Sequence, residues 1–253
     1  MKITGNTILI TGGGTGIGRG LAEAFHAQGN KVVIAGRRRA QLQETTAANP
    51  GMSFMEFDAQ DAAGVRNFAD RLAAEHPALN VLINNSGIMR VEKLQAQQED
   101  LADAEATIST NLLGPIRLTA ALLPLLAKQE QSTIVNVTSG LAFVPLTFVP
   151  TYCATKAALH SYTESLRYQL RGTSTEVVEL IPPYVQTNLL DGAEDRRAMP
   201  LPAFIEEVMG IIGKDPAVRE ICVDRVNFLR LAAAQGRYDA TFTTLNEAMA
   251  GGE

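Results

Sequence analysis

The sequence predicts a single α/β domain in which a parallel sheet of about seven strands carries helices on both faces. Short β-branched runs alternate with longer segments of helical periodicity, and this alternation is typical of parallel strands joined by crossover helices. No linker, internal repeat or low-complexity tract interrupts it along the 253 residues. A glycine-rich turn also joins the first strand to the first helix, which is the arrangement found in doubly wound folds.

Seven apolar runs have the length and composition of buried strands. They are residues 7–10, 31–36, 52–57, 80–84, 133–138, 176–181 and 220–223. Helices are predicted after the glycine turn, after the second strand up to about residue 48, and over 62–75, about 98–126, 152–171, about 204–212 and about 226–235. Residues 238–249 are expected to form another packed segment. Within the longest of them, Gly114-Pro115 is expected to bend the helix, because proline removes a backbone donor.

Composition excludes several classes of function. The formal net charge of −5 gives no basic footprint for nucleic acid or anionic lipid. The two cysteines and three histidines form neither a disulfide framework nor a metal-ligand spacing. The N-terminus has no secretory signal pattern, and the apolar runs are shorter than the roughly 20 residues that span a bilayer. We therefore expect a cytoplasmic protein with no nucleic-acid, membrane or metal partner.

The stretch 11–18, with the sequence TGGGTGIG, follows the first strand directly. A strand, a glycine turn and a helix N-terminus together cradle a pyrophosphate, because free backbone N–H groups and the helix dipole face the anion. The stretch therefore predicts a dinucleotide site of the Rossmann type, with a plain glycine turn that caps the strand as the alternative. The candidate cofactor-binding residues here are Gly12, Gly14, Thr15, Gly16, Ile17 and Gly18.

Three arginines, Arg37, Arg38 and Arg39, follow the second strand. In dinucleotide folds an acidic residue at this point holds the ribose 2′-hydroxyl of NAD, whereas arginine accommodates the 2′-phosphate of NADP. Cations near a helix N-terminus also oppose its dipole, so their presence suggests an anion. The run favours NADP(H) over NAD(H), with Arg37 as the first candidate for the contact and Arg38 as the second. A solvated basic patch is the alternative.

Tyr152 and Lys156 are four residues apart in a predicted helix and so share one face. A phenol is a poor proton donor near neutrality, and an adjacent cation lowers its pKa. Of the five tyrosines, only Tyr152 has a lysine at this spacing. In isolation the pair would still be interpreted as ordinary solvated side chains.

Several motifs, in this order, resemble the short-chain dehydrogenase/reductase family, and the resemblance covers nearly the whole chain. The family's glycine turn matches residues 11–18, and its Y-x-x-x-K motif matches Tyr152 and Lys156. Its active-site serine matches Ser139, and the asparagine of its catalytic tetrad matches Asn111. Its N-N-A-G motif after the fourth strand is present as residues 84–87, with serine in place of alanine.

This resemblance implies an oxidoreductase that interconverts a ketone and a secondary alcohol. Tyr152 would be the general acid or base, and Ser139 would bind the substrate oxygen. Lys156 would hold the nicotinamide ribose and depress the pKa of Tyr152, and Asn111 would hold a water that joins Lys156 to solvent. The cofactor-binding residues that the resemblance adds are Asp58, Ala59, Asn85 and Gly87.

The same residues also have plainer interpretations. Asn84 and Asn85 would then only terminate a strand, and Asp58 would only cap the next helix. Ser139 would belong to an ordinary turn, although its interval from Tyr152 and the glycine after it favour the site.

The run after the sixth strand departs from the family. The family has Pro-Gly at this turn, whereas this chain has Pro182-Pro183. Proline lacks the conformational freedom of glycine, so Pro183 is expected to stiffen the nicotinamide side of the site. The resemblance adds Pro182, Val185 and Thr187 to the cofactor-binding residues. The run PPYVQT also resembles a subgroup of oxidoreductases associated with D-alanyl-lipoteichoic acid operons, a likeness that says little about the substrate.

Residues 188–213 match the variable segment that forms a lid over the substrate in this family. Apolar residues near the expected site predict a neutral, fairly bulky ketone or its alcohol. The candidates for the pocket wall are Leu141, Phe148, Tyr184 and Leu189. His160 is expected at a helix interface, and the family implies a homodimer or homotetramer formed through the fourth and fifth helices.

Two alternatives to an NADP(H)-dependent carbonyl reductase remain open. A cofactor-binding sensor or scaffold would keep the fold without turnover, although the retained tyrosine and lysine argue against it. An NAD(H)-preferring alcohol dehydrogenase would keep the chemistry and change the cofactor. A serine hydrolase is disfavoured, because the sequence contains no G-x-S-x-G elbow.

Overall fold

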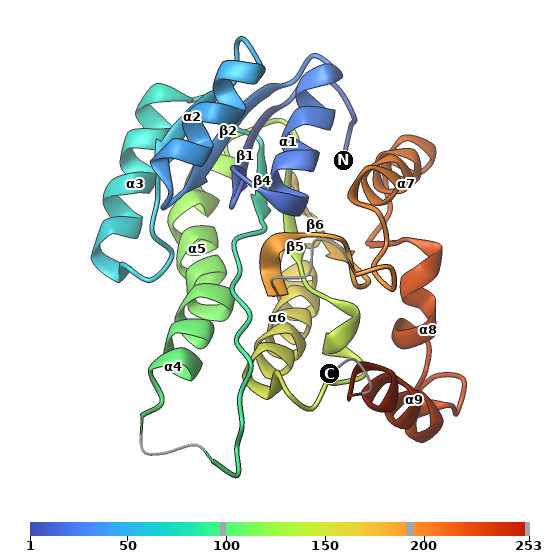
Figure 1. Cartoon of the computed structure of the whole chain (residues 1–253). Helices are drawn as coiled ribbons and strands as arrows, with labels where there is room; N and C mark the ends of the chain where they lie inside the picture. Colours follow the sequence, from blue (N-terminus) through green and yellow to red (C-terminus); the bar gives the residue numbers. More distant parts are fainter. Residues whose placement is uncertain (97–99, 191–194, 251–253) are drawn as a thin grey trace.

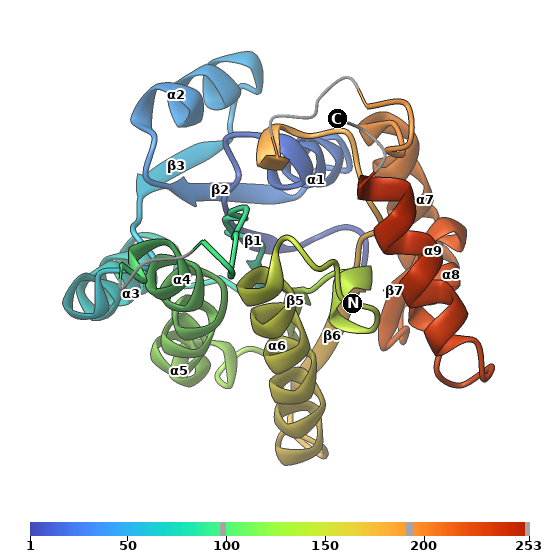
Figure 2. The ribbon, with the colours of Figure 1, turned by 60° about the horizontal axis from the view of Figure 1, so that its bottom comes forward.

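The computed structural model describes residues 1–96, 100–190 and 195–250. Seven strands form one parallel sheet in the order β3-β2-β1-β4-β5-β6-β7 (Figures 1 and 2). They are β1 (Thr7–Thr11), β2 (Lys31–Gly36), β3 (Ser53–Glu56), β4 (Val81–Asn84), β5 (Ser132–Val137), β6 (Thr175–Ile181) and β7 (Glu220–Cys222). The predicted doubly wound fold is confirmed, and each predicted strand ends within one residue of the observed one.

Helices cover both faces of this sheet (Figure 2). One face carries α1 (Gly16–Ala27), α2 (Arg39–Ala48) and α7 (Leu201–Lys214). The other carries α3 (Ala62–Glu75), α5 (Gly114–Leu126) and α6 (Pro150–Gln169). The short helices α4 (Ala102–Ile108) and α8 (Asn227–Arg230) and the C-terminal helix α9 (Tyr238–Ala250) complete the chain.

Alternate residues of each central strand enter two separate apolar cores. In β1, Ile8 and Ile10 pack with Phe25 of α1 and Phe204 of α7. Leu9, between them, belongs to the core formed with α3 and α5. Because both faces of the strand are buried, the sequence is continuously apolar there instead of alternating.

The predicted helix over 98–126 is wrong in detail. One π-helical turn, Ser109–Leu113, joins α4 to α5, so the helix is distorted there and not at Gly114-Pro115. Pro115 lies in the first turn of α5, where a missing N–H costs nothing. The predicted start at residue 98 lies outside the described residues. The helix predicted over 226–235 is also shorter, since α8 covers only Asn227–Arg230.

The helical run Ala102–Leu126 is 25 residues long and contains an 18-residue window with a mean hydropathy of 1.2, so it is long and apolar enough to cross a membrane by length and composition. In this fold it has another explanation. Leu118, Leu122 and Leu126 of α5 are buried in the core beneath the sheet. The core helix of an α/β domain has this apolar composition because it packs between the sheet and neighbouring helices.

The strand order reverses between β1 and β4, whose neighbours lead to opposite edges of the sheet. In open α/β sheets, ligands bind in the crevice outside the carboxyl ends of the strands at such a point. The predicted site residues follow the carboxyl ends of six different strands, from β1 to β6. The fold therefore brings residues that are far apart in sequence to one edge of the sheet.

Candidate active site

The glycine turn after β1 is tightly packed against the turn after β4. Gly12 has a φ of +69°, which favours glycine. A Cβ atom on Gly18 would lie 2.3 Å from the Gly12 carbonyl oxygen and 2.5 Å from Asn85 Nδ2. No side chain fits there, so only glycine lets the start of α1 pack this closely against the turn after β1. This geometry fits the pyrophosphate of a dinucleotide at the N-terminus of α1.

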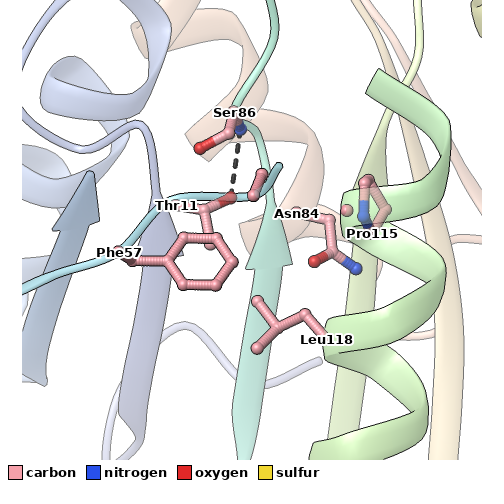
Figure 3. Close-up of a pocket in the computed structure, with 8 residues that line it drawn as sticks. Thr11, Phe57, Asn84, Ser86, Pro115 and Leu118 are labelled. Carbon is pink, nitrogen blue, oxygen red and sulfur yellow. Dashed lines mark hydrogen bonds between the residues drawn. The ribbon is translucent and has the colours of Figure 1, made fainter. Parts of the chain in front are cut away.

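Thr11, the last residue of β1, ties the two turns together. Its hydroxyl accepts a hydrogen bond from the N–H group of Ser86 at 3.0 Å (Figure 3). It also accepts one from the N–H group of Asn85 at 3.0 Å. Asn85 Nδ2 donates back to the Thr11 carbonyl oxygen at 2.9 Å. Asn84 crosslinks the neighbouring strand instead, through a 2.8 Å hydrogen bond from Nδ2 to Asn136 Oδ1. Both asparagines thus do more than terminate β4.

A small pocket opens between these turns and α5 (Figure 3). Asn84 Oδ1 is buried there and has no hydrogen-bond partner among the described residues. A buried acceptor without a donor is costly, so this atom also fits a site that a polar ligand completes. The lining residues are Thr11, Phe57, Ala59, Asn84, Ser86, Gly114, Pro115 and Leu118.

Asp58 lies next to this pocket with an exposed side chain. Its carboxylate accepts a hydrogen bond from Gln60 N at 2.9 Å. The helix cap that was the alternative role for Asp58 is provided by Asp61, which accepts from Gly64 N at 2.9 Å. Asp58 is therefore available to a ligand, and the buried Ala59 is beside it.

The three arginines after β2 have different environments. Arg38 donates to Thr15 Oγ1 at 2.9 Å and so lies against the glycine turn. Arg39 forms an ion pair with Glu56 and lies over the Phe54 ring. Arg37 is exposed. The sequence placed Arg37 before Arg38 as a phosphate contact, and of these two it is Arg38 that contacts the glycine turn.

Asn111 occupies the π turn between α4 and α5 and is 0% exposed. Its side-chain amide accepts from Ile88 N at 2.9 Å and donates to Ile88 O at 2.8 Å. It also donates to Thr155 Oγ1 in α6 at 3.3 Å. Asn111 thus joins the turn after β4 to the helix that carries Tyr152. Isolated π turns are common at functional sites.

Lys156 is buried, with only 4% of the residue exposed. Its Nζ donates to the Val137 carbonyl oxygen at 2.8 Å and lies 5.5 Å from the centroid of the Tyr152 ring. A Cβ on Gly87 would lie 3.8 Å from Nζ and 3.5 Å from Asn111 Oδ1, so the turn after β4 also reaches this point. Burial lowers the pKa of Lys156 to about 8.

Ser139 and Tyr152 lie together at the start of α6. The Ser139 hydroxyl accepts from Leu141 N at 3.1 Å and caps a 3₁₀ turn, Gly140–Ala142. Burial raises the pKa of Tyr152 above its usual 10, while the Ser139 hydroxyl favours the ionised form. The resemblance implied that Lys156 depresses this pKa. In the structure the largest influence on the Tyr152 pKa is the removal of the phenol from water, and this influence raises the pKa.

The turn after β6 approaches the glycine turn despite its two prolines. The Pro182 carbonyl oxygen accepts from Gly140 N at 2.9 Å, which ties this turn to the segment after Ser139. Val185 is buried and pairs with Met199 in an isolated bridge. A Cβ on Gly16 would lie 3.4 Å from Thr187 Cγ2. The residues expected on the nicotinamide side thus adjoin the predicted pyrophosphate cradle.

An apolar wall surrounds Tyr152 on its other side. Leu141 and Phe148, two of the predicted wall residues, pack against a buried cluster that contains Tyr152, Met89 and Val149. Leu189 is 39% exposed, and the Tyr184 hydroxyl donates to Asp195 at 3.3 Å. Residues 191–194 of the expected lid lie outside the described residues.

Sequence reasoning missed that α9 completes this wall. Leu245 and Met249 pack against the Tyr152 cluster from a helix almost a hundred residues further along the chain. Asn246 fixes that helix, since it accepts from Thr147 N at 2.8 Å and donates to Pro145 O at 3.2 Å. Arg197 donates to the Ala248 carbonyl oxygen at 2.6 Å. Helical periodicity shows the apolar face of such a segment but not what it covers.

A sequence model described as short chain dehydrogenase matches residues 6–198. The chain belongs to this family. The uncharacterized oxidoreductase DltE of Bacillus subtilis is 40% identical to this short-chain dehydrogenase over 249 residues, covering 97% of this chain and 98% of the relative. The NADP-dependent 3-hydroxy acid dehydrogenase YdfG of Shigella flexneri is 30% identical over 179 residues, covering 70% of this chain and 72% of the relative.

A solved structure supports the fold of this short-chain dehydrogenase. The crystal structure of a short chain dehydrogenase from Burkholderia cenocepacia J2315 in complex with NADP superposes with a TM-score of 0.81 at 24% identity. The superposition covers 97% of this chain and 99% of that one. The family resemblance deduced from the sequence is confirmed by the match to the family model and by the relative DltE. Residues 199–253, including α7 to α9, lie beyond the family match.

Proposed function

We propose that this short-chain dehydrogenase is an NADP(H)-dependent carbonyl reductase that interconverts a ketone and a secondary alcohol. The observation that carries the proposal is the meeting of Ser139, Tyr152 and Lys156 at one buried place, next to a glycine turn that admits no side chain. A proton donor, an oxygen-binding hydroxyl and a cation are the groups that carbonyl reduction requires.

Each side chain has a role that follows from its contacts. Ser139 Oγ accepts from Leu141 N, and its own proton faces the Tyr152 hydroxyl, where it would also bind the substrate oxygen. Tyr152 donates the proton to that oxygen, and burial keeps its phenol in the protonated form that reduction uses. Lys156 gives one N–H to Val137 O and has two left for the nicotinamide ribose. Bound NADPH supplies the hydride.

Asn111 contributes by holding the site together. Both polar atoms of its side chain are engaged by the backbone of Ile88. The water that the family implies at this position would therefore be held by backbone groups of the π turn. The amide links the turn after β4 to α6, and so sets the distance between the cofactor-binding turn and Lys156.

Two observations support NADP(H) as the cofactor. Arg38 lies against Thr15 at the edge of the glycine turn, where a 2′-phosphate is held in dinucleotide folds. The relative YdfG is described as NADP-dependent. The apolar wall of Leu141, Phe148, Leu245 and Met249 supports a neutral substrate with a bulky apolar part.

The function is tested by following oxidation of NADPH and NADH with neutral aryl and alkyl ketones graded in size. We expect turnover with NADPH. Tyr152→Phe removes the proton donor and should lower kcat about 100-fold or more while NADPH still binds. NADPH binding without turnover of any ketone would favour a sensor or scaffold, and a preference for NADH would contradict the role of the arginines.

The cofactor contact is tested by separate substitutions of the two arginines. A hydrogen bond between a guanidinium and a phosphate contributes about 1.5–3 kcal/mol, so Arg38→Ala should raise the KM for NADPH about 10-fold or more. The KM for NADH should stay unchanged, because NADH has no 2′-phosphate. Arg37→Ala is the matched control with a smaller effect. A larger effect of Arg37→Ala would restore the order that the sequence suggested.

We also propose that the protein is a homo-oligomer formed through the fourth and fifth helices that the sequence predicts, which are the run of α4 and α5 and the helix α6 in the structure. Leu101 just before α4, Ile108 at the end of α4 and Leu113 at the end of the π turn are 51%, 41% and 36% exposed. Exposed apolar side chains that gather on one element mark an interaction surface.

A further inference from the structure

A carboxylate is buried in the sheet beside the candidate site. The side chain of Glu179 in β6 is 0% exposed. It accepts a hydrogen bond from Thr138 Oγ1 at 2.7 Å. The imidazole Nδ1 of His160, in α6, lies 2.8 Å and 3.0 Å from the two carboxylate oxygens. A carboxylate this completely buried requires a cation nearby, because an unpaired buried charge is strongly destabilising.

Both partners of this carboxylate adjoin the candidate active site. Thr138 directly precedes Ser139. His160 follows Lys156 by one helical turn and so shares its face of α6. The His160 ring also packs edge-on against Phe143, with ring centroids 4.7 Å apart, and Phe143 follows the 3₁₀ turn that Ser139 caps. The pair of Glu179 and His160 therefore supports the Ser139 segment at both of its ends.

Other charged groups face His160 from three elements. Glu164 in α6 lies 3.9 Å from His160 Nε2. Arg230 in α8 lies 4.5 Å over the Phe143 ring and donates two 2.9 Å hydrogen bonds to Glu220 in β7. The hydrogen bond with Glu179 has the largest influence and raises the pKa of His160 above its usual 6.5, whereas burial and Arg230 oppose it.

In this group of side chains, each of the two buried or half-buried glutamates is paired with one cation. Glu179 is matched by His160, and Glu220 by Arg230, with the two glutamates in register on adjacent strands. Cys222 nearby adds no charge, because burial and Glu220 raise the pKa of its thiol to about 11. Loss of the proton from His160 leaves the Glu179 charge without compensation.

We propose that Glu179 and His160 are positioning residues for carbonyl reduction: their ion pair fixes Thr138 and Phe143, and through them holds the Ser139 hydroxyl where it binds the substrate oxygen. This inference rests on the proposed function. If the ion pair were purely structural, its removal would change the stability of the fold and leave kcat unchanged. A positioning pair changes kcat and leaves the KM for NADPH unchanged, because Ser139 acts on the substrate.

Neutral substitutions separate these two roles. His160→Gln keeps a hydrogen-bond donor but removes the cation, so Glu179 stays buried without a counter-charge. We expect kcat at pH 7 to fall about 10-fold or more. In the double variant H160Q/E179Q, two neutral amides replace the ion pair, and kcat should recover to within about threefold of the wild type because the two effects are coupled. His76→Gln, at the end of α3, is the matched control and leaves kcat unchanged.

A second readout needs no turnover. The chain has three histidines, so the imidazole signal of His160 can be assigned in NMR spectra with the H160Q variant. Glu179→Gln removes the anion and should lower the pKa of His160. In the wild type, kcat should fall as rising pH removes the proton from His160, and E179Q should abolish this fall. The decreases in kcat that follow from loss of the Lys156 and Tyr152 protons should remain. If H160Q fails to fold, E179Q and the double variant carry the test.

Three results would overturn the proposal. They are a wild-type kcat in folded H160Q, a double variant no faster than H160Q, and a His160 pKa that E179Q leaves unchanged. Failure of the proposed function is a different result, since the wild type would then reduce none of the ketones while the NMR titration still reports on the ion pair.

Discussion

Replacing Lys156 with methionine should stop carbonyl reduction and raise the stability of the fold at pH 7. The ammonium group of Lys156 is buried, and burial lowers its pKa from 10.5 to about 8. The protein is therefore destabilised by holding this charge out of water. Methionine has a similar length and no charge, so it removes both the cost and the function of the cation.

The size of the effect follows from the change in pKa. Each pKa unit corresponds to about 1.4 kcal/mol, so the buried charge costs about 3 kcal/mol at pH 7. The variant loses the hydrogen bond to Val137 O, which contributes about 1 kcal/mol. We expect a net gain of about 2 kcal/mol in the free energy of unfolding and a loss of about 100-fold or more in kcat.

The gain depends on pH with a definite sign. Below about pH 8, Lys156 is charged in both the folded and the unfolded chain, and the full cost applies. Between about 8 and 10.5 the folded chain releases the proton that the unfolded chain keeps, so the wild type recovers stability as the pH rises. The advantage of the methionine variant should shrink across that window.

Urea denaturation at pH 7 and at pH 10 measures this difference. Lys128→Met, at an exposed lysine just after α5, is the matched control and should change stability by no more than about 0.5 kcal/mol. A Lys156→Met variant that is less stable than the wild type at pH 7 would contradict the destabilising role of the charge.

The sequence predicted those parts of the site that depend on local spacing. The turn after β1 and the pair Tyr152 and Lys156 are short-range patterns, and the alternation of strands and helices orders them along one sheet edge. Once the strands and helices are known to alternate, the general preference for doubly wound parallel sheets is enough to order the strands. These features need no knowledge of side-chain packing.

The remaining features depend on contacts between distant residues. The π turn around Asn111 arises because its amide bonds to Ile88, twenty-three residues earlier, and proline and glycine nearby suggested a bend instead. Glu179 is detectable in the sequence, because a glutamate within a strand that is buried on both faces requires a cation in the adjacent helical layer. His160 in α6 is that cation, and only the packing of α6 on β6 shows it.

Replacing Gly18 with alanine should abolish tight binding of NADPH. The added Cβ would lie 2.3 Å from the Gly12 carbonyl oxygen and 2.8 Å from its carbonyl carbon, which are backbone atoms with no freedom to rotate away. It would also meet Asn85 Nδ2 at 2.5 Å and disturb the hydrogen bond from Asn85 to Thr11 O. The glycine turn can accept the methyl group only by moving out of the position that cradles the pyrophosphate.

We expect the Kd for NADPH to rise about 100-fold, which corresponds to about 2.7 kcal/mol, when it is measured by the fluorescence of the bound nicotinamide. Gly210→Ala in α7 is the control, because a Cβ there meets no atom within 4 Å and alanine favours the helix by about 1 kcal/mol. That variant should bind NADPH as the wild type does and unfold at a higher temperature. A folded Gly18→Ala protein with wild-type affinity would show that the cofactor approaches this fold elsewhere, and would remove the physical basis for placing the pyrophosphate at α1.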